Sequence, residues 1–96
     1  NIGEIRISLN SLENIALSAS RKISGVKETK AYVSKLGEDV SIYIRTVVLP
    51  DTHIPTLSEE LQIKVKKAVE ETSGINVTDV KVSVENIYTG YKSRVE

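Results

Sequence analysis

The sequence contains no cysteine, methionine, phenylalanine or tryptophan and has one histidine among its 96 residues. Without cysteine, neither a disulfide framework nor a zinc site with thiolate ligands can form. One histidine also excludes a metal site with two imidazole ligands. Small secreted domains usually depend on disulfides, so the absence of cysteine favours a reducing compartment and predicts a cytoplasmic location.

Excess charge and long apolar runs are absent as well. Thirteen basic residues balance thirteen acidic ones, whereas proteins that bind nucleic-acid backbones normally carry a positive excess. No apolar run approaches the roughly 20 residues of a membrane span, and no signal peptide opens the sequence. Because the sequence starts at Asn1 and lacks methionine, we expect a fragment of a longer protein, which could carry a membrane segment elsewhere.

The residues that catalysis requires are scarce. His53 stands near Asp51 in a loop, where an exposed surface residue is a simpler interpretation than a general base. Pairs of neighbouring carboxylates fall at a turn or along a helix and need no acid–base role. The five glycines are isolated, so no phosphate-binding loop is present. We therefore predict that the domain is not an enzyme and has no catalytic residues, no metal site and no cofactor.

The apolar residues form an aliphatic pattern. They make up 40% of the chain, and their spacing alternates between the strand period of two and the helix period of 3.6. This pattern predicts six elements in chain order, namely a strand over residues 3–8, a helix over 9–23, strands over 29–36 and 40–49, a helix over 56–73, and a strand around Val80, Val82 and Val84.

Local signals mark the ends of the two helices. Ser8 or Asn10 is placed to cap the first helix, the latter with a capping-box glutamate three positions later. Thr56 and Glu59 form a capping-box pattern at the start of the second helix. Gly74 predicts the end of that helix, because glycine tolerates the left-handed conformation that closes helices.

The element order is β-α-β-β-α-β, and two similar helix-to-strand steps, Ser-Gly-Val at residues 24–26 and Ser-Gly-Ile at 73–75, indicate a weak internal duplication. The order predicts an α+β fold, a two-layer split βαβ sandwich. Its four-stranded, mostly antiparallel sheet would carry both helices on one face. Residues 1–87 form a single domain in this prediction, and residues 88–96 form a polar tail.

The two middle strands are predicted to form a hairpin in which Tyr32 faces Tyr43 and Val33 faces Ile42. Alternation then assigns eight residues to the sheet face without helices: Arg6, Lys30, Tyr32, Tyr43, Arg45, Val47, Lys81 and Glu85. We predict Tyr32, Tyr43, Arg45 and Val47 as a protein contact face, because interfaces are enriched in tyrosine and arginine. A simply solvated sheet face is the alternative.

Other modes of binding remain open. Ile63 falls off the buried stripe of the second helix, so it is either a scattered exposed apolar residue or part of a contact. An open strand edge could pair with another chain. RNA-recognition folds share the strand order, but they stack bases on aromatic residues of their central strands, where this chain offers one outward tyrosine. Small-ligand regulatory modules share the topology too.

Residues 53–87, with the sequence HIPTLSEELQIKVKKAVEETSGINVTDVKVSVENI, resemble the hallmark segment of the bacterial alkaline shock protein family. The shared features are an Ile-Pro step, a helix rich in lysine and glutamate, a Gly-Ile-x-Val step and a valine-rich strand. Residues 3–8 (GEIRIS) and 12–16 (LENIA) are similar to the family's first strand and helix. The resemblance implies a non-catalytic domain that binds itself or related alkaline shock proteins in envelope or alkaline stress.

Within the family, the short segment 27–39 resembles the membrane-anchor members, since the main shock proteins tend to carry a longer glycine-containing insertion here. Such members have amino-terminal membrane helices and recruit soluble relatives to the inner face of the membrane. The resemblance thus implies a location at that face, through a segment absent from this sequence. The balanced charge separately predicts no nucleic-acid partner.

Overall fold

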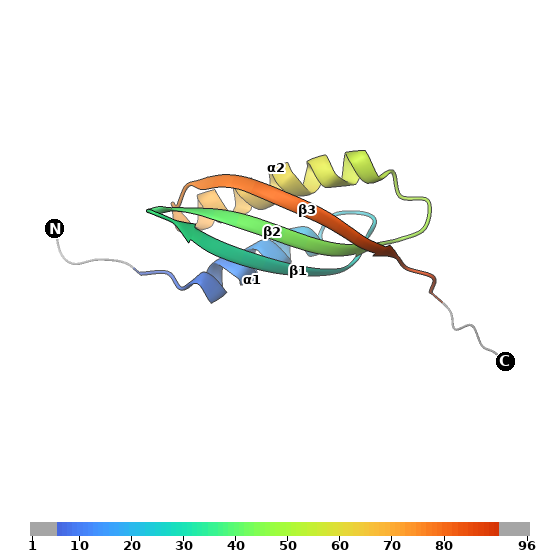
Figure 1. Cartoon of the computed structure of the whole chain (residues 1–96), viewed down its shortest axis with the longest axis horizontal. Coiled ribbons are helices and arrows are strands. Elements are labelled where there is room, and N and C mark those ends of the chain that lie inside the picture. The colour runs from blue at the N-terminus through green and yellow to red at the C-terminus, as the bar shows by residue number, and fades with distance from the viewer. Residues whose placement is uncertain (1–5, 91–96) are drawn as a thin grey trace.

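The computed structural model describes residues 6–90, which fold into two layers (Figure 1). The first layer is a sheet, and the second consists of two helices that lie on one face of it. In chain order the elements are α1 (Leu9–Arg21), β1 (Val26–Leu36), β2 (Asp39–Val48), α2 (Ile54–Ser73) and β3 (Val77–Ile87). The predicted α+β class, with both helices on one face of the sheet, is therefore confirmed.

The sheet differs from the prediction in strand number and direction. Within residues 6–90 it has three strands in the order β1-β2-β3, with β1 antiparallel and β3 parallel to β2. The predicted strand over residues 3–8 lies partly outside the described residues, and Arg6–Ser8 belong to no strand. A split βαβ sandwich needs a strand between β2 and β3, but these two pair directly. Apolar periodicity sets the buried face of a strand but not its neighbour, and this is why the prediction was wrong.

The hairpin matches the prediction. Tyr32 pairs with Tyr43, and Val33 pairs with Ile42. Leu36 pairs with Asp39, so the loop contains two residues. Gly37 takes a φ of 64° in this loop, in the left-handed region that glycine adopts without steric cost.

The helix ends match the prediction in part. Ser8, one of the two candidates, caps α1 by accepting a hydrogen bond from the Ser11 N–H (3.0 Å). The start of α2 was predicted wrongly, because the helix begins at Ile54 and its N-cap is His53. Thr56 thus lies inside the first turn, where its hydroxyl meets His53 Nδ1 at 2.7 Å. Gly74 ends α2 in the left-handed conformation, as predicted (φ 77°).

In the described residues, the apolar core between the two layers is aliphatic, and the hydroxyl side chains of Ser20 and Thr46 are buried as well. Each strand points alternate side chains at the helices, and each helix presents one apolar stripe to the sheet. The buried apolar side chains are Leu12, Ala16, Ile23, Ala31, Val33, Val40, Ile42, Ile44, Val48, Leu57, Leu61, Val65, Val69, Val77 and Val80.

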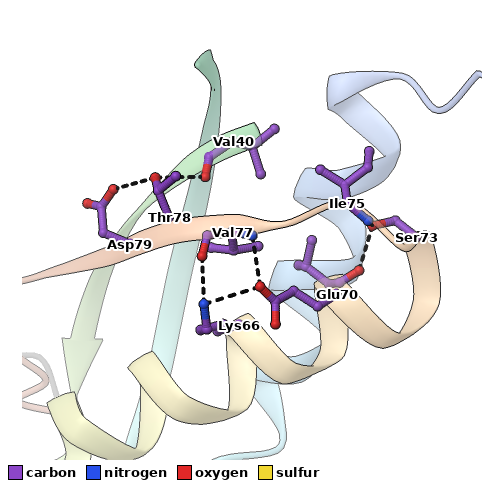
Figure 2. A network of polar contacts seen from close by, with 9 residues as sticks. Val40, Lys66, Glu70, Ser73, Ile75, Val77, Thr78 and Asp79 are labelled. Atoms are coloured by element: carbon purple, nitrogen blue, oxygen red, sulfur yellow. Dashed lines mark hydrogen bonds and ion pairs between the residues drawn. The ribbon is translucent and has the colours of Figure 1, made fainter. Parts of the chain in front are cut away.

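Helix α2 also binds the start of β3 through polar side chains (Figure 2). The Val77 N–H donates to Glu70 Oε2 (2.9 Å), and Lys66 Nζ donates to the Val77 carbonyl oxygen (2.7 Å). Lys66 and Glu70 also form an ion pair at 3.1 Å. The Val77 hydrogen bond, and then Lys66, lower the pKa of Glu70. At the opposite edge of the sheet, Glu13 of α1 accepts from the Val33 N–H of β1 (3.0 Å).

We predict that Glu70→Gln lowers the urea midpoint of unfolding at neutral pH. A carboxyl whose pKa is depressed by folding stabilises the fold above its unfolded pKa of about 4.3, and this contribution is lost as pH falls through the lower folded value. The difference between wild type and variant should therefore vanish in acid. Glu71→Gln is the control, since Glu71 is exposed and lies 4.0 Å from Lys67. Equal losses in both variants, or a difference that does not depend on pH, would contradict this role.

Candidate protein-interaction site

The side of the sheet opposite the helices, here called the outer face, carries four of the five predicted contact residues. Alternation along β1 and β2 puts the side chains of Tyr32, Tyr43, Arg45 and Val47 on this face, while their sequence neighbours enter the core. Other outer-face positions are Glu28, Lys30, Ser34, Ser41, Asp79, Lys81, Ser83 and Glu85. Arg6 was also predicted here, but it lies outside the strands.

Two tyrosines lie side by side on this face. The rings of Tyr32 and Tyr43 stack across the hairpin, with centroids 6.1 Å apart and an angle of 29° between their planes. About two fifths of each side chain stays exposed, 42% for Tyr32 and 40% for Tyr43. The pair therefore presents one continuous aromatic surface in a stacked geometry.

An ion pair borders the tyrosines. Arg45 Nη2 lies 2.9 Å from Glu85 Oε1 of β3, and the Ser83 hydroxyl donates to the other carboxylate oxygen of Glu85. The Ser83 hydrogen bond, followed by that from Arg45, lowers the pKa of Glu85, and Glu85 raises the pKa of Arg45. An exposed pair of this kind adds little to stability. It places the guanidinium group beside the aromatic pair.

Val47 lies next to this ion pair, in a shallow hollow of about 240 Å³. The hollow is lined by Glu28, Thr29, Lys30, Arg45, Thr46, Val47 and Glu85. Its walls thus carry both signs of charge around one apolar side chain. Such a mixture suits a side chain of a protein partner better than a single anion or cation.

The fifth predicted residue, Ile63, lies elsewhere. It is on α2, in the helix layer, and 59% of it is exposed. Lys66, Lys67, Glu70 and Glu71 surround it. The structure therefore brings four of the predicted residues together and separates the fifth from them.

Sequence reasoning did not find the Arg45–Glu85 contact. Both residues were assigned to the outer face, but their contact depends on β3 lying directly beside β2. The predicted split sandwich placed another strand between them. The sequence does show opposite charges at two outer-face positions, Arg45 and Glu85. Such a pair predicts a contact only when the two strands are known to be neighbours.

The described residues offer little for chemistry or for spanning a membrane. Within residues 6–90, no three histidine, cysteine, aspartate or glutamate side chains gather into a group that could hold a metal ion. In the same range, neither helix is both long enough and apolar enough to cross a membrane. His53 lies at the amino end of α2, with Thr56 as its hydrogen-bond partner.

Comparison with known proteins first defines the class. The fold is a two-layer α+β domain that resembles solved structures of the MamM CTD. A zinc form superimposes with a TM-score of 0.61 and 19% identity, covering 88% of this chain and 91% of that chain. A copper form superimposes with a TM-score of 0.61 and 19% identity, covering 82% of this chain and 98% of that chain. A manganese form superimposes with a TM-score of 0.60 and 18% identity, covering 82% of this chain and 99% of that chain. At such identities the likeness shows the fold alone.

The family is then given by a sequence model. The model of the alkaline shock protein 23 family, described as having a cell envelope-related function, matches residues 28–89. The chain belongs to this family. None of the curated proteins matches it.

We predict that the two outer-face tyrosines stabilise each other measurably. In a double-mutant cycle of Tyr32→Thr and Tyr43→Thr, stacking across the hairpin should appear as a coupling energy of about 0.5–1 kcal/mol in urea unfolding. The distant pair Tyr32→Thr and Ile63→Thr is the control and should be additive. A coupling of zero for the tyrosines would mean that the rings do not stack in solution.

Proposed function

We propose that this chain is a non-catalytic protein-interaction domain whose outer face binds related alkaline shock proteins or a second copy of itself. The observation that carries the proposal is the gathering of Tyr32, Tyr43, Arg45 and Val47 on a sheet face that neither helix covers. Tyrosine and arginine are the residue types that most often dominate binding energy at protein interfaces.

The geometry of the face favours binding at low entropic cost. The tyrosines are stacked, and Glu85 holds Arg45 in place, so few side chains need to be ordered when a partner binds. Charges of both signs surround the aromatic pair. A partner with the complementary pattern would be guided into one orientation, while like charges would exclude others.

The size of the face predicts a weak contact. Three strands at about 4.8 Å spacing, with 11, 10 and 11 residues at about 3.3 Å each, give a flat area of roughly 500 Å². A stable interface usually buries about 800 Å² on each partner. The outer face alone therefore suits a transient contact, which would become strong when many copies are displayed together.

Display on a membrane would supply this multiplicity. We propose that the chain is the cytoplasmic part of a membrane-anchor protein similar to the alkaline shock response membrane anchor protein AmaP, held at the inner face of the membrane by a segment outside this sequence. Two observations support the proposal. The family description is cell envelope-related, and β1 and β2 are joined by a two-residue loop without insertion.

Cell fractionation tests the anchor. The native full-length protein should sediment with membranes, resist extraction by high salt and be released by detergent, because a hydrophobic segment is not displaced by ions. Release by salt alone would indicate peripheral attachment. Recovery in the soluble fraction would remove the anchor from the proposal and leave the interaction domain.

The binding face is tested with a purified alkaline shock relative from the same cell. We predict that Tyr43→Glu weakens binding by about tenfold or more in a calorimetric titration, because it removes an aromatic anchor and places a charge in the contact. Ser18→Glu adds the same charge at an exposed position of α1 and should leave the affinity unchanged. Equal effects of the two substitutions would reject the outer face, and a selective effect of Ile63→Glu would move the contact to α2.

A further inference from the structure

At the β3 edge of the sheet, side chains of α2 protect the amino end of the strand but not its carboxyl half. At the amino end of β3, side chains of α2 bind the outward backbone groups of Val77 and Val80. The bond from Gln62 Nε2 to the Val80 carbonyl oxygen (3.2 Å) is the last such bond toward the carboxyl end of β3 in the described residues. Beyond it, β3 runs away from α2 (Figure 1). The carboxyl half of β3 is thus an edge without a helix along it.

The hydrogen-bonding direction of this half follows from the same contacts. The Val80 carbonyl points at α2 and not at β2, so Val80 faces outward. Backbone groups of alternate strand residues point to the same side, and Val82 and Val84 therefore also face outward. The register is regular from Val80 to Val84, because the irregularities lie before Ser41 and after Thr46 of β2. Both valine side chains are only half-buried.

We propose that this edge pairs antiparallel with the same edge of a second copy, with Ser83 on the two-fold axis. In this register Lys81 of each copy lies opposite Glu85 of the other on the outer face. Val82 lies opposite Val84 on the helix side, and their outward N–H and C=O groups form the hydrogen bonds. An unpaired edge strand is a template for such pairing.

Charge selects this register over its neighbours. A pair centred on Val82 would place Asp79 opposite Glu85, and like charges facing each other destabilise a strand pair. A pair centred on Val84 would place Lys81 opposite Ile87. The pair centred on Ser83 makes the Lys81–Glu85 contact twice, as an isologous interface requires. It spans residues 81–85, so the α2 bonds at Val77 and Val80 stay intact.

The pairing has a consequence for the outer face. Two three-stranded sheets would join into one of six strands, and two outer faces would lie side by side. The area available to a relative would double to roughly 1,000 Å² on the same strand spacing, which reaches the size of a stable interface. The edge pair itself does not depend on the outer face binding anything.

A single cysteine tests the axis, because the chain contains no cysteine of its own. Ser83 lies between the outward residues, so it meets its copy in a non-hydrogen-bonded pair with Cα atoms about 4.5 Å apart, within disulfide range. We predict that Ser83→Cys gives a covalent dimer under mild oxidation at micromolar concentration. The control, Ser34→Cys, places an exposed thiol on the same face at the other edge and should stay monomeric. Equal crosslinking of both variants would overturn the proposal.

Charge exchange provides a second, non-covalent test by sedimentation velocity. Lys81→Glu alone and Glu85→Lys alone should each raise the dimer dissociation constant about tenfold or more, because each brings like charges together. A mixture of the two variants restores both contacts and should form heterodimers. Thermal melts by circular dichroism establish that each variant is folded, which matters because Glu85→Lys also loses the contact with Arg45. A mixture that stays monomeric would overturn the edge pair.

The outer-face contact and the β3 edge pair can be tested independently of each other. Ser83→Cys crosslinking that persists in a Tyr43→Glu background would support the edge pair, whatever the relative binds. A wild-type dimer abolished by Tyr43→Glu but unchanged in Lys81→Glu would place self-association on the outer face and overturn the edge pair.

Discussion

The parallel pairing of β2 with β3 is the constraint on which the rest of this structure depends. A parallel pair cannot be joined by a tight turn, so α2 must cross the sheet between them. The same helix then fixes where β3 begins, through Glu70 and Lys66 at Val77 (Figure 2). This start sets the register, and the register decides that Glu85 meets Arg45 and that Lys81 lies beside Tyr43.

The composition of the core has a functional counterpart at the surface. Every side chain in the buried apolar cluster is leucine, isoleucine, valine or alanine. In the part of the chain that the structure describes, the tyrosines lie outside this cluster, and two of them stack on the outer face. Aliphatic side chains, many of them β-branched, pack the interior. The large rings are thus left for contact with other molecules.

Local features were the part of the fold that the sequence predicted well. The period of the apolar residues identified both helices and three strands, and glycine at position 37 located the hairpin loop. The sheet order was not predictable in this way, because a half-buried strand has the same alternating pattern beside a parallel or an antiparallel neighbour. The start of α2 was misplaced since Pro55 fits the first turn of a helix, and the capping-box pattern at Thr56 pointed two residues too late.

In the candidate site, too, local features were predictable from the sequence and contacts that depend on strand order were not. Parity alone placed Tyr32, Tyr43, Arg45 and Val47 on one face, and the hairpin register brought the rings together as expected. The contacts that come from β3 needed the strand order. Glu85 contacts Arg45 because β3 lies directly beside β2, and the open edge at Val82 and Val84 follows from β3 being the last strand of the sheet in residues 6–90.

The proposed binding surface is one side of a small aliphatic domain, the outer face that the helices leave uncovered. The most direct measurement is a titration of the ¹⁵N-labelled domain with a purified alkaline shock relative, followed by amide chemical shifts. Our account predicts the largest changes along β1 and β2 at Tyr32, Tyr43, Arg45 and Val47, with α1 unchanged. Changes confined to α1 and α2, with these strands unaffected, would contradict it.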